Sequence, residues 1–266
     1  MRKLMGLVVV LALAAAAVLI LRGRDRPQKQ TPVDDPSEET GQTLAATAMK
    51  GIVIAPEDLG IMTENTELGG INITVVDEGG GQTVYTFTDV AKDSWYADAV
   101  NYTVSAGLMN GLSGTTLFRP EFGLQRESFA LILYRFAGGE PTEPRHRFED
   151  VTQGEWYADA VNWTTSRGIL SGLSGTSFGV GEYMTCERAL VALYHLAGDP
   201  KTDGTLENYP YAPKVSESAR NAVSWAWNSG LITEIECVWY PTQAISRAQV
   251  ALLMMRYSTM VERQTA

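Results

Sequence analysis

An internal repeat constrains the fold of this chain more than any other feature of its sequence. A block with fixed aromatic, acidic and glycine positions occurs at residues 87–107 and returns with a constant shift of 61 residues. The paired positions are Phe87, Asp89, Val90, Trp95, Tyr96, Ala99, Val100 and Gly107 in the first copy, and Phe148, Asp150, Val151, Trp156, Tyr157, Ala160, Val161 and Gly168 in the second. A third, more diverged copy has matching residues at Ala222, Val223, Gly230, Trp239, Pro241, Ile245 and Arg247. Since repeated units bury their apolar faces against one another, the sequence predicts one domain of three similar units plus an N-terminal extension.

Each unit is predicted to consist of a helix, a loop and a second helix. In the first copy Asp93-Ser94 precede an apolar periodic stretch and Gly107 follows it, which predicts an N-cap and a C′ glycine for the first helix. The second helix is predicted over about 126–136, with Gly138 ending it. Helices of about 12 residues are marginal alone in water. We therefore expect a mainly α fold in which three helical hairpins form a central bundle with a pseudo-threefold arrangement and grooves between units.

The loop between the two helices contains a glycine string that is identical in two units. Gly111-Leu112-Ser113-Gly114-Thr115 recurs unchanged at residues 172–176. Glycines at this spacing commonly supply positive φ in turns, and we expect this in both loops.

The 85 residues before the repeats divide into three segments. Residues 1–21 place Arg2 and Lys3 before an uncharged stretch, which is typical of a signal peptide or a signal-anchor helix; the uncleaved anchor is favoured because the small residues lie inside the stretch. Residues 22–49 are polar and are predicted to be a disordered tether. Residues 50–85 contain apolar residues that alternate with polar ones, and predict either a short β-rich segment or a linker packed on the first unit.

Composition and motifs argue against several classes of function. The formal net charge is -10 and the chain lacks clustered Lys and Arg, so we expect no nucleic-acid partner. No arrangement typical of a hydrolase, a metalloprotease or a phosphate-binding loop occurs, and we expect no enzyme activity. His146 and His195 lie in different units without Cys or carboxylate at ligand spacing, so we expect no metal site and no cofactor.

The repeated residues resemble the S-layer homology family. The matching motifs are Phe-x-Asp-Val, a Trp-Tyr helix ending in Ala-Val, a Gly-Leu/Ile-x-x-Gly string, Phe-x-Pro, and a second helix that starts like Ile-Thr-Arg-Ala-Glu. The resemblance covers 86–139 (unit 1), 147–198 (unit 2) and 207–258 (unit 3). Three units in tandem are the usual number in a complete domain of this family. It implies a three-pronged, pseudo-trimeric helical domain that attaches exported proteins non-covalently to secondary cell-wall polysaccharide, often pyruvylated, or in some relatives to peptidoglycan.

The family's arginine motif has a physical rationale at the start of the second helix. An Arg just inside the helix N-terminus places a bidentate cation beside free backbone N–H groups and the positive end of the helix dipole, which suits a pyruvyl carboxylate. Arg126 and Arg247 keep this position, whereas Cys186 replaces the Arg of unit 2. The resemblance therefore implies at most two competent anionic subsites, led by Arg126 and Arg247. The alternative for each is a solvated surface charge.

The three copies also differ in their helix caps. Unit 3 keeps a Ser-x-x-Gln capping box at Ser246 and Gln249, unit 2 keeps Thr185, and unit 1 has lost the cap at Gln125.

Further candidate binding residues come with the resemblance. Asp89 follows Phe87 by two residues and either accepts hydrogen bonds from sugar hydroxyls or holds the turn into the helix. Gly111 and Gly172 belong to the loops beside the predicted grooves. Trp95 and Trp156 have rings that can stack on sugars, although their place on an apolar helical face favours core packing.

Cys186 and Cys237 are the only cysteines of the chain. If neighbouring units form a groove, the two face each other, and an exported protein permits a disulfide. Two buried free thiols are the favoured alternative.

The sequence thus predicts a non-enzymatic cell-surface protein, monomeric, that binds anionic wall polysaccharide or peptidoglycan and contacts the membrane through its N-terminal segment. Its expected location is outside the cell, in the wall or surface layer. A second hypothesis is a diverged scaffold for protein interaction at the membrane surface, favoured by the lost Arg of unit 2 and the absence of a cargo domain. A wall-modifying enzyme is the third, and the missing catalytic motif argues against it.

Overall fold

The computed structural model describes residues 70–76, 80–145 and 147–265. The predicted export segment 1–21, the tether 22–49 and the part of the β-rich segment before residue 70 lie outside these residues. Within the described part of the chain, no helix combines the length and the apolar character needed to cross a membrane.

The described chain is mainly α-helical, as predicted, and begins with one strand pair. The strands and helices in chain order are β1 (Ile71–Val76), β2 (Gln82–Phe87), α2 (Ala97–Ser105), α3 (Arg126–Phe136), α4 (Ala158–Ser166), α5 (Cys186–Leu196), α6 (Arg220–Asn228) and α7 (Arg247–Thr265), with two short 3-10 turns at Ala212–Lys214 and Glu217–Ala219. The sequence placed the second helix of unit 1 over 126–136, and α3 has these bounds. Residues 50–85 are β-rich where they are described.

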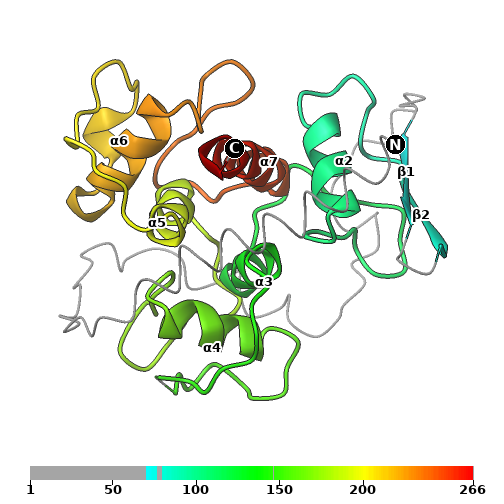
Figure 1. Ribbon diagram of the computed structural model, residues 1–266, viewed down its shortest axis with the longest axis horizontal. Helices are drawn as coiled ribbons and strands as arrows, with labels where there is room; N and C mark the ends of the chain where they lie inside the picture. The colour runs from blue at the N-terminus through cyan, green and yellow to red at the C-terminus, as the bar shows by residue number, and fades with distance from the viewer. Residues whose placement is uncertain (1–69, 77–79, 146, 266) are drawn as a thin grey trace.

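The three second helices, α3, α5 and α7, form the centre of the molecule, and the three first helices lie around them (Figure 1). Each outer helix packs on the central helix of another unit: α4 on α3, α6 on α5 and α2 on α7. The last of these contacts joins unit 3 back to unit 1. The arrangement confirms the predicted pseudo-threefold bundle, but the predicted helical hairpins are wrong, because the first helix of each unit packs on the second helix of another unit and not on its own. The three contacts between units are called the 1–2, 2–3 and 3–1 junctions.

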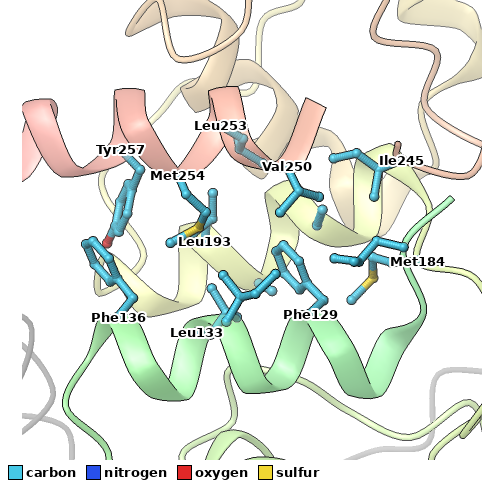
Figure 2. Packing of buried hydrophobic residues seen from close by; sticks show 14 of the residues in the cluster. Phe129, Leu133, Phe136, Met184, Leu193, Ile245, Val250, Leu253, Met254 and Tyr257 are labelled. Atoms are coloured by element: carbon cyan, nitrogen blue, oxygen red, sulfur yellow. The ribbon is translucent and has the colours of Figure 1, made fainter. Parts of the chain in front are cut away.

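Apolar side chains from the three central helices fill the axis of the bundle (Figure 2). Phe129 and Leu133 of α3 face Leu193 of α5 and Leu253 and Met254 of α7, and all five are fully or almost fully buried. Burying a side chain of this size contributes about 1.5–3 kcal/mol. Because no single unit encloses these residues, each unit depends on the other two for its stability.

A ring of backbone hydrogen bonds surrounds the axis where the central helices begin. The N–H of Leu124 donates to the carbonyl of Ile245 (2.9 Å), the N–H of Ile245 to that of Met184 (2.8 Å), and the N–H of Met184 to that of Leu124 (2.9 Å). The three side chains are buried below the ring. The ring fixes the three helix starts at one level, so equivalent residues of the three units face equivalent loops.

The caps of the central helices follow the predictions. At α7 the N–H of Ser246 donates to Oε1 of Gln249 (2.8 Å) and the N–H of Gln249 donates to Oγ of Ser246 (3.2 Å), which is a complete capping box. Oγ1 of Thr185 accepts from the N–H of Arg188 at α5, and Gln125 gives α3 no side-chain cap.

The caps of the outer helices are only partly as predicted. The expected N-cap at 93–94 is wrong, because α2 begins at Ala97 after Tyr96, which provides no side-chain cap. Ser94 instead donates its hydroxyl to a backbone carbonyl three residues earlier, in a turn that leads into the helix. Gly107 does follow the end of α2 with φ +68°, as expected for a C′ glycine.

The glycine strings serve two different purposes. Gly114 has φ +75°, as predicted, but its equivalent Gly175 does not adopt positive φ, and neither do Gly111 and Gly172. A Cβ on Gly111 would lie 2.5 Å from Cε1 of Phe87, and one on Gly172 would lie 2.6 Å from Cε1 of Phe148. These two positions therefore need glycine for the close approach of an aromatic ring, and the expectation of positive φ is wrong for them.

The N-terminal hairpin packs on the outer helix of unit 1. Strands β1 and β2 pair antiparallel from Ile71 opposite Phe87 to Val76 opposite Gln82. Ile73 and Phe87 are buried, and β1 contacts α2. The hairpin extends the core of unit 1.

Candidate functional site

Arg126 begins α3 and reaches across the 1–2 junction into the loop of unit 2. Its Nε donates to the carbonyl of Phe178 (2.9 Å) and its Nη2 to that of Ser171 (2.6 Å). The guanidinium carbon lies 4.9 Å from the centre of the Phe178 ring. The side chain is only 2% exposed, and burial, followed by the nearby charge of Arg188, lowers its pKa to about 10. The guanidinium therefore stays charged at neutral pH and joins two units.

Arg247 makes the same contacts across the 3–1 junction. Its Nε donates to the carbonyl of Phe118 (2.7 Å) and its Nη2 to that of Asn110 (2.6 Å). The guanidinium carbon lies 4.6 Å from the Phe118 ring, and burial lowers the pKa of the group to about 10.

The two arginines are structural cross-links as well as candidate ligand contacts. Arg126 is buried, and Arg247 is partly buried with its Nε and Nη2 bound to backbone carbonyls, so the alternative of a solvated surface charge is wrong for both. Nη1 of Arg126 and Nη1 of Arg247 make no hydrogen bond with any residue that the structure describes. Each guanidinium thus retains donors that can meet an anion, and contact with a ligand stays a prediction.

Asp89 of unit 1 and Asp150 of unit 2, which are equivalent positions of the repeat, hold the turn before the central helix. Asp89 accepts the N–H groups of Phe118 (2.8 Å) and Arg119 (2.7 Å). Asp150 accepts hydrogen bonds from the corresponding N–H groups of Phe178 (2.8 Å) and Gly179 (2.7 Å), and also from the N–H of Val180 and the hydroxyl of Ser177. Burial opposes its ionisation, but these hydrogen bonds lower the pKa of Asp150 overall. Of the two roles predicted for Asp89, the structure therefore shows the contacts that hold the turn.

The 2–3 junction lacks the arginine and is closed by aromatic side chains. Cys186 occupies the helix start, and Trp239 lies at the position of Phe118 and Phe178 and is 1% exposed. The hydroxyl of Tyr209 donates to the carbonyl of Trp239, the equivalent of the carbonyl that an arginine Nε binds in the other junctions. Nε1 of Trp239 is buried without a hydrogen-bond partner.

Cys186 and Cys237 are both free thiols in the structure, Cys186 buried and Cys237 partly buried. Burial, followed by the charge of Cys237, raises the pKa of Cys186 to about 12. Burial also raises the pKa of Cys237, to about 11. The structure therefore has the two free thiols that the sequence analysis favoured, and the disulfide stays a prediction.

Acidic groups distinguish the 1–2 junction from the 3–1 junction. Glu127 follows Arg126 and is buried, with Oε2 accepting the N–H of Gly181 (3.0 Å). Burial raises the pKa of this carboxyl above its ordinary value. Ala248 holds the corresponding place after Arg247. Glu127 therefore adds a carboxyl group beside Arg126 that has no counterpart directly after Arg247, although the charge of Asp89 acts on Arg247 as that of Asp150 acts on Arg126.

Arg119 is the residue at this site that sequence reasoning missed. Its backbone has φ +59°, and the side chain is 8% exposed. Its Nε is buried without a hydrogen-bond partner, and its guanidinium carbon lies 4.8 Å from the centre of the Phe122 ring. The only signal in the sequence was the contrast with Gly179, which follows Phe178 as Arg119 follows Phe118.

The two tryptophans of the repeat have different surroundings. Trp95 is partly buried against the core and packs edge-on against Tyr96, with the ring centres 5.1 Å apart. Trp156 is 57% exposed, so the expectation of core packing is wrong for it. The ring of Trp156 lies edge-on against Tyr157 and leaves an aromatic surface open to solvent.

Comparison with known proteins identifies the repeated unit. Residues 86–130 and 147–185 match the family model described as S-layer homology domain. A surface-layer 125 kDa protein of Lysinibacillus sphaericus is 31% identical over 148 residues, which are 54% of this chain and 12% of that protein. The S-layer protein sap of Bacillus anthracis is 24% identical over 177 residues, 62% of this chain and 20% of the relative. An amylopullulanase of Thermoanaerobacterium thermosulfurigenes is 26% identical over 175 residues, 64% of this chain and 9% of that protein.

These relatives are much longer than the aligned region. The chain spans between 9% and 20% of the three proteins.

Proposed function

Because residues 86–130 and 147–185 belong to the S-layer homology domain family, we propose that this chain binds secondary cell-wall polysaccharide non-covalently, through an anionic, pyruvylated sugar. A cell-surface role bound to the wall follows from the family and from the surface-layer relatives. The finer assignment of the ligand rests on one observation. Arg126, which is buried, and Arg247, which is partly buried, begin central helices at junctions between units, and no described residue binds the Nη1 of either.

The geometry suits a carboxylate on a neutral or acidic polymer. The net charge of -10 repels polyanions in general, so an anionic glycan must be attracted by local positive charge at a partly dehydrated site. A charge-assisted hydrogen bond contributes about 1.5–3 kcal/mol, which gives a carboxylate-bearing sugar an advantage over its neutral counterpart. The loops that flank the junctions expose Leu112 and Leu173, which can pack on the apolar face of a sugar ring.

Retention on purified cell walls tests the proposal. The protein should sediment with sacculi that keep their wall polysaccharide and stay in solution with sacculi from which the polymer has been removed by hydrofluoric acid. The control variant Arg167→Gln should be retained like the wild type, because this arginine is exposed and lies over Trp163, outside the candidate contacts. Equal retention on complete and stripped sacculi would contradict polysaccharide binding and favour peptidoglycan.

We also propose that the chain is not itself an enzyme and that it is exported, with residues 1–21 as signal or membrane anchor. A second candidate is a scaffold for protein interaction, and the 2–3 junction favours it, since aromatic packing there replaces the cation. Co-purification of one protein partner in the absence of any glycan would support the scaffold.

A further inference from the structure

One edge of β1 has no partner strand in the part of the chain that the structure describes. β1 pairs with β2 along its other edge, and the described sheet has these two strands. In an antiparallel pair the N–H and C=O groups of alternate residues point toward the partner, so those of the other residues of β1 point away from β2. An open strand edge of this kind is a template for the addition of a further strand.

The hairpin lacks the features that protect an open edge in most proteins, which are charged side chains, proline and bulges. β1 has the sequence Ile-Asn-Ile-Thr-Val-Val and β2 the sequence Gln-Thr-Val-Tyr-Thr-Phe, and neither contains a charged residue or a proline. The chain as a whole is 20% charged. Most residues of β1 are also β-branched, which favours strands. The open edge is therefore suited to pairing and is not protected against it.

A cleft of about 230 Å³ lies beside the open edge of β1. Asn72 on the outer face of the strand and Ile73 on the buried face both line it, and no residue of β2 does. Because neighbouring residues of a strand point to opposite faces, a cleft that touches both lies next to the strand and not above or below it. Ala97 and Asn101 of α2 form the opposite wall. The space is thus bounded by a strand edge and a helix, where an added strand would lie about 4.8 Å from β1.

The chain itself has a segment suited to this cleft shortly before β1. Residues 52–54 are Ile-Val-Ile, bounded by Lys50 and Pro56, and they lie outside the described residues. Residues 55–70 connect them to β1, which is more than twice the length of the strand and allows the chain to reverse direction. Strands that are consecutive in a sequence are usually neighbours in the sheet. The position of this segment in the chain therefore favours it over a segment from another molecule.

We propose that residues 52–54 add to the open edge of β1 as a third strand and fill the cleft beside α2. Side chains alternate along a strand, so Ile52 and Ile54 share one face and Val53 lies on the other. In the cleft Ile52 and Ile54 extend the apolar face that contains Ile73, and Val53 lies on the outer face. Three strands packed on a helix are stable where a two-stranded hairpin is marginal. The added strand fastens the N-terminal part of the chain to unit 1, whatever ligand the repeats bind.

Hydrogen exchange of the full chain, measured by mass spectrometry on fragments that cover β1, tests the inference. Val53→Pro and Ile54→Pro are made separately, because one of two neighbouring N–H groups faces β1 in any register and proline removes it. At least one of the two should speed exchange in β1 by about tenfold or more, which corresponds to the loss of a hydrogen-bonded partner. Gln42→Pro, in the polar stretch before the segment, should exchange like the wild type.

A matched pair of side-chain substitutions tests which face enters the cleft. Ile54→Asn places a polar group against the apolar wall and should also speed exchange in β1. Val53→Thr keeps a β-branched residue on the outer face and should leave the exchange unchanged. Equal effects of the two substitutions would overturn the proposed orientation.

Three results would overturn the third strand itself. One is equally rapid exchange of all β1 amides that do not pair with β2, in wild type and variants alike. The second is protection of β1 that persists in both proline variants, which would assign the edge to a different segment. The third is protection that is lost on dilution of the wild type, which would assign the edge to a second copy of the chain. The amides of α3 should exchange alike in every variant, and faster exchange there would contradict a strand that packs only on unit 1.

Discussion

Removing the guanidinium of Arg126 should destabilise the whole bundle, because this group joins units 1 and 2. Arg126→Met keeps an unbranched stem that reaches about as far as Nε, and it deletes the hydrogen bonds to Phe178 and Ser171. Two hydrogen bonds from a charged group contribute about 1.5–3 kcal/mol each, and the contact with the Phe178 ring adds about 0.5–2 kcal/mol. Relief from burying a charge offsets part of this sum. We expect a net loss of about 3 kcal/mol in the free energy of unfolding.

The measurement is urea and thermal unfolding followed by circular dichroism. For a domain of this size about 3 kcal/mol corresponds to a fall of roughly 6–12 °C in melting temperature. The matched control is Arg167→Met, an exposed arginine whose contact is the Trp163 ring at 5.1 Å, which should change the stability by less than about 1 kcal/mol. If Arg126→Met also changes stability by less than about 1 kcal/mol, the two carbonyl contacts do not hold the units together and the cross-link is refuted.

Two further substitutions and one titration test other parts of the structure. Tyr209→Phe leaves the buried carbonyl of Trp239 without its donor, and we expect a loss of about 1–2 kcal/mol in urea denaturation; an unchanged midpoint would contradict the contact. Burial raises the pKa of Glu127 above its unfolded value of about 4.3, so its stabilising contribution is present below that value and is lost as pH rises through the folded pKa. Glu127→Gln should therefore raise the melting temperature at pH 7 relative to wild type and much less at pH 4, and an equal effect at both would refute the titration. Cys186 and Cys237 have pKa values raised to about 12 and about 11, and since the thiolate is the form that oxidises, titration of the denatured, non-reduced protein should find two free thiols; finding none would show that they pair.

The central helices could be predicted from the sequence because local signals determine their ends. The apolar spacing over 126–136 and the glycine at 138 bound α3 within one unit. The capping box could be predicted for the same reason, because Ser246 and Gln249 are only three residues apart in the sequence. Comparison of the three copies also showed that the arginine at the start of the second helix is present in units 1 and 3 and replaced by Cys186 in unit 2.

The rest of the site depends on contacts between units, which no single copy displays. The alternation of outer and central helices brings the start of α3 against a loop about 50 residues later, and the start of α7 against one about 130 residues earlier. The sequence motif therefore located Arg126 and Arg247 but not their carbonyl partners. The left-handed backbone of Arg119 is set by Asp89, which binds two N–H groups some 30 residues away. Trp156 was misplaced because its position in the repeat matches Trp95, although its own ring faces solvent.

The contact of α2 with α7 gives the bundle a mechanical property that an open array of repeats lacks. In an open solenoid, tension applied at one terminus can peel the units away one after another, since each touches only its neighbours along the chain. Here the first outer helix is seated on the last central helix, so a pull on the N-terminal hairpin loads unit 1 and unit 3 at once. The core then has to yield as a whole rather than unit by unit. A surface protein held by its wall contacts and pulled through its N-terminal segment would accordingly resist detachment as a single cooperative body.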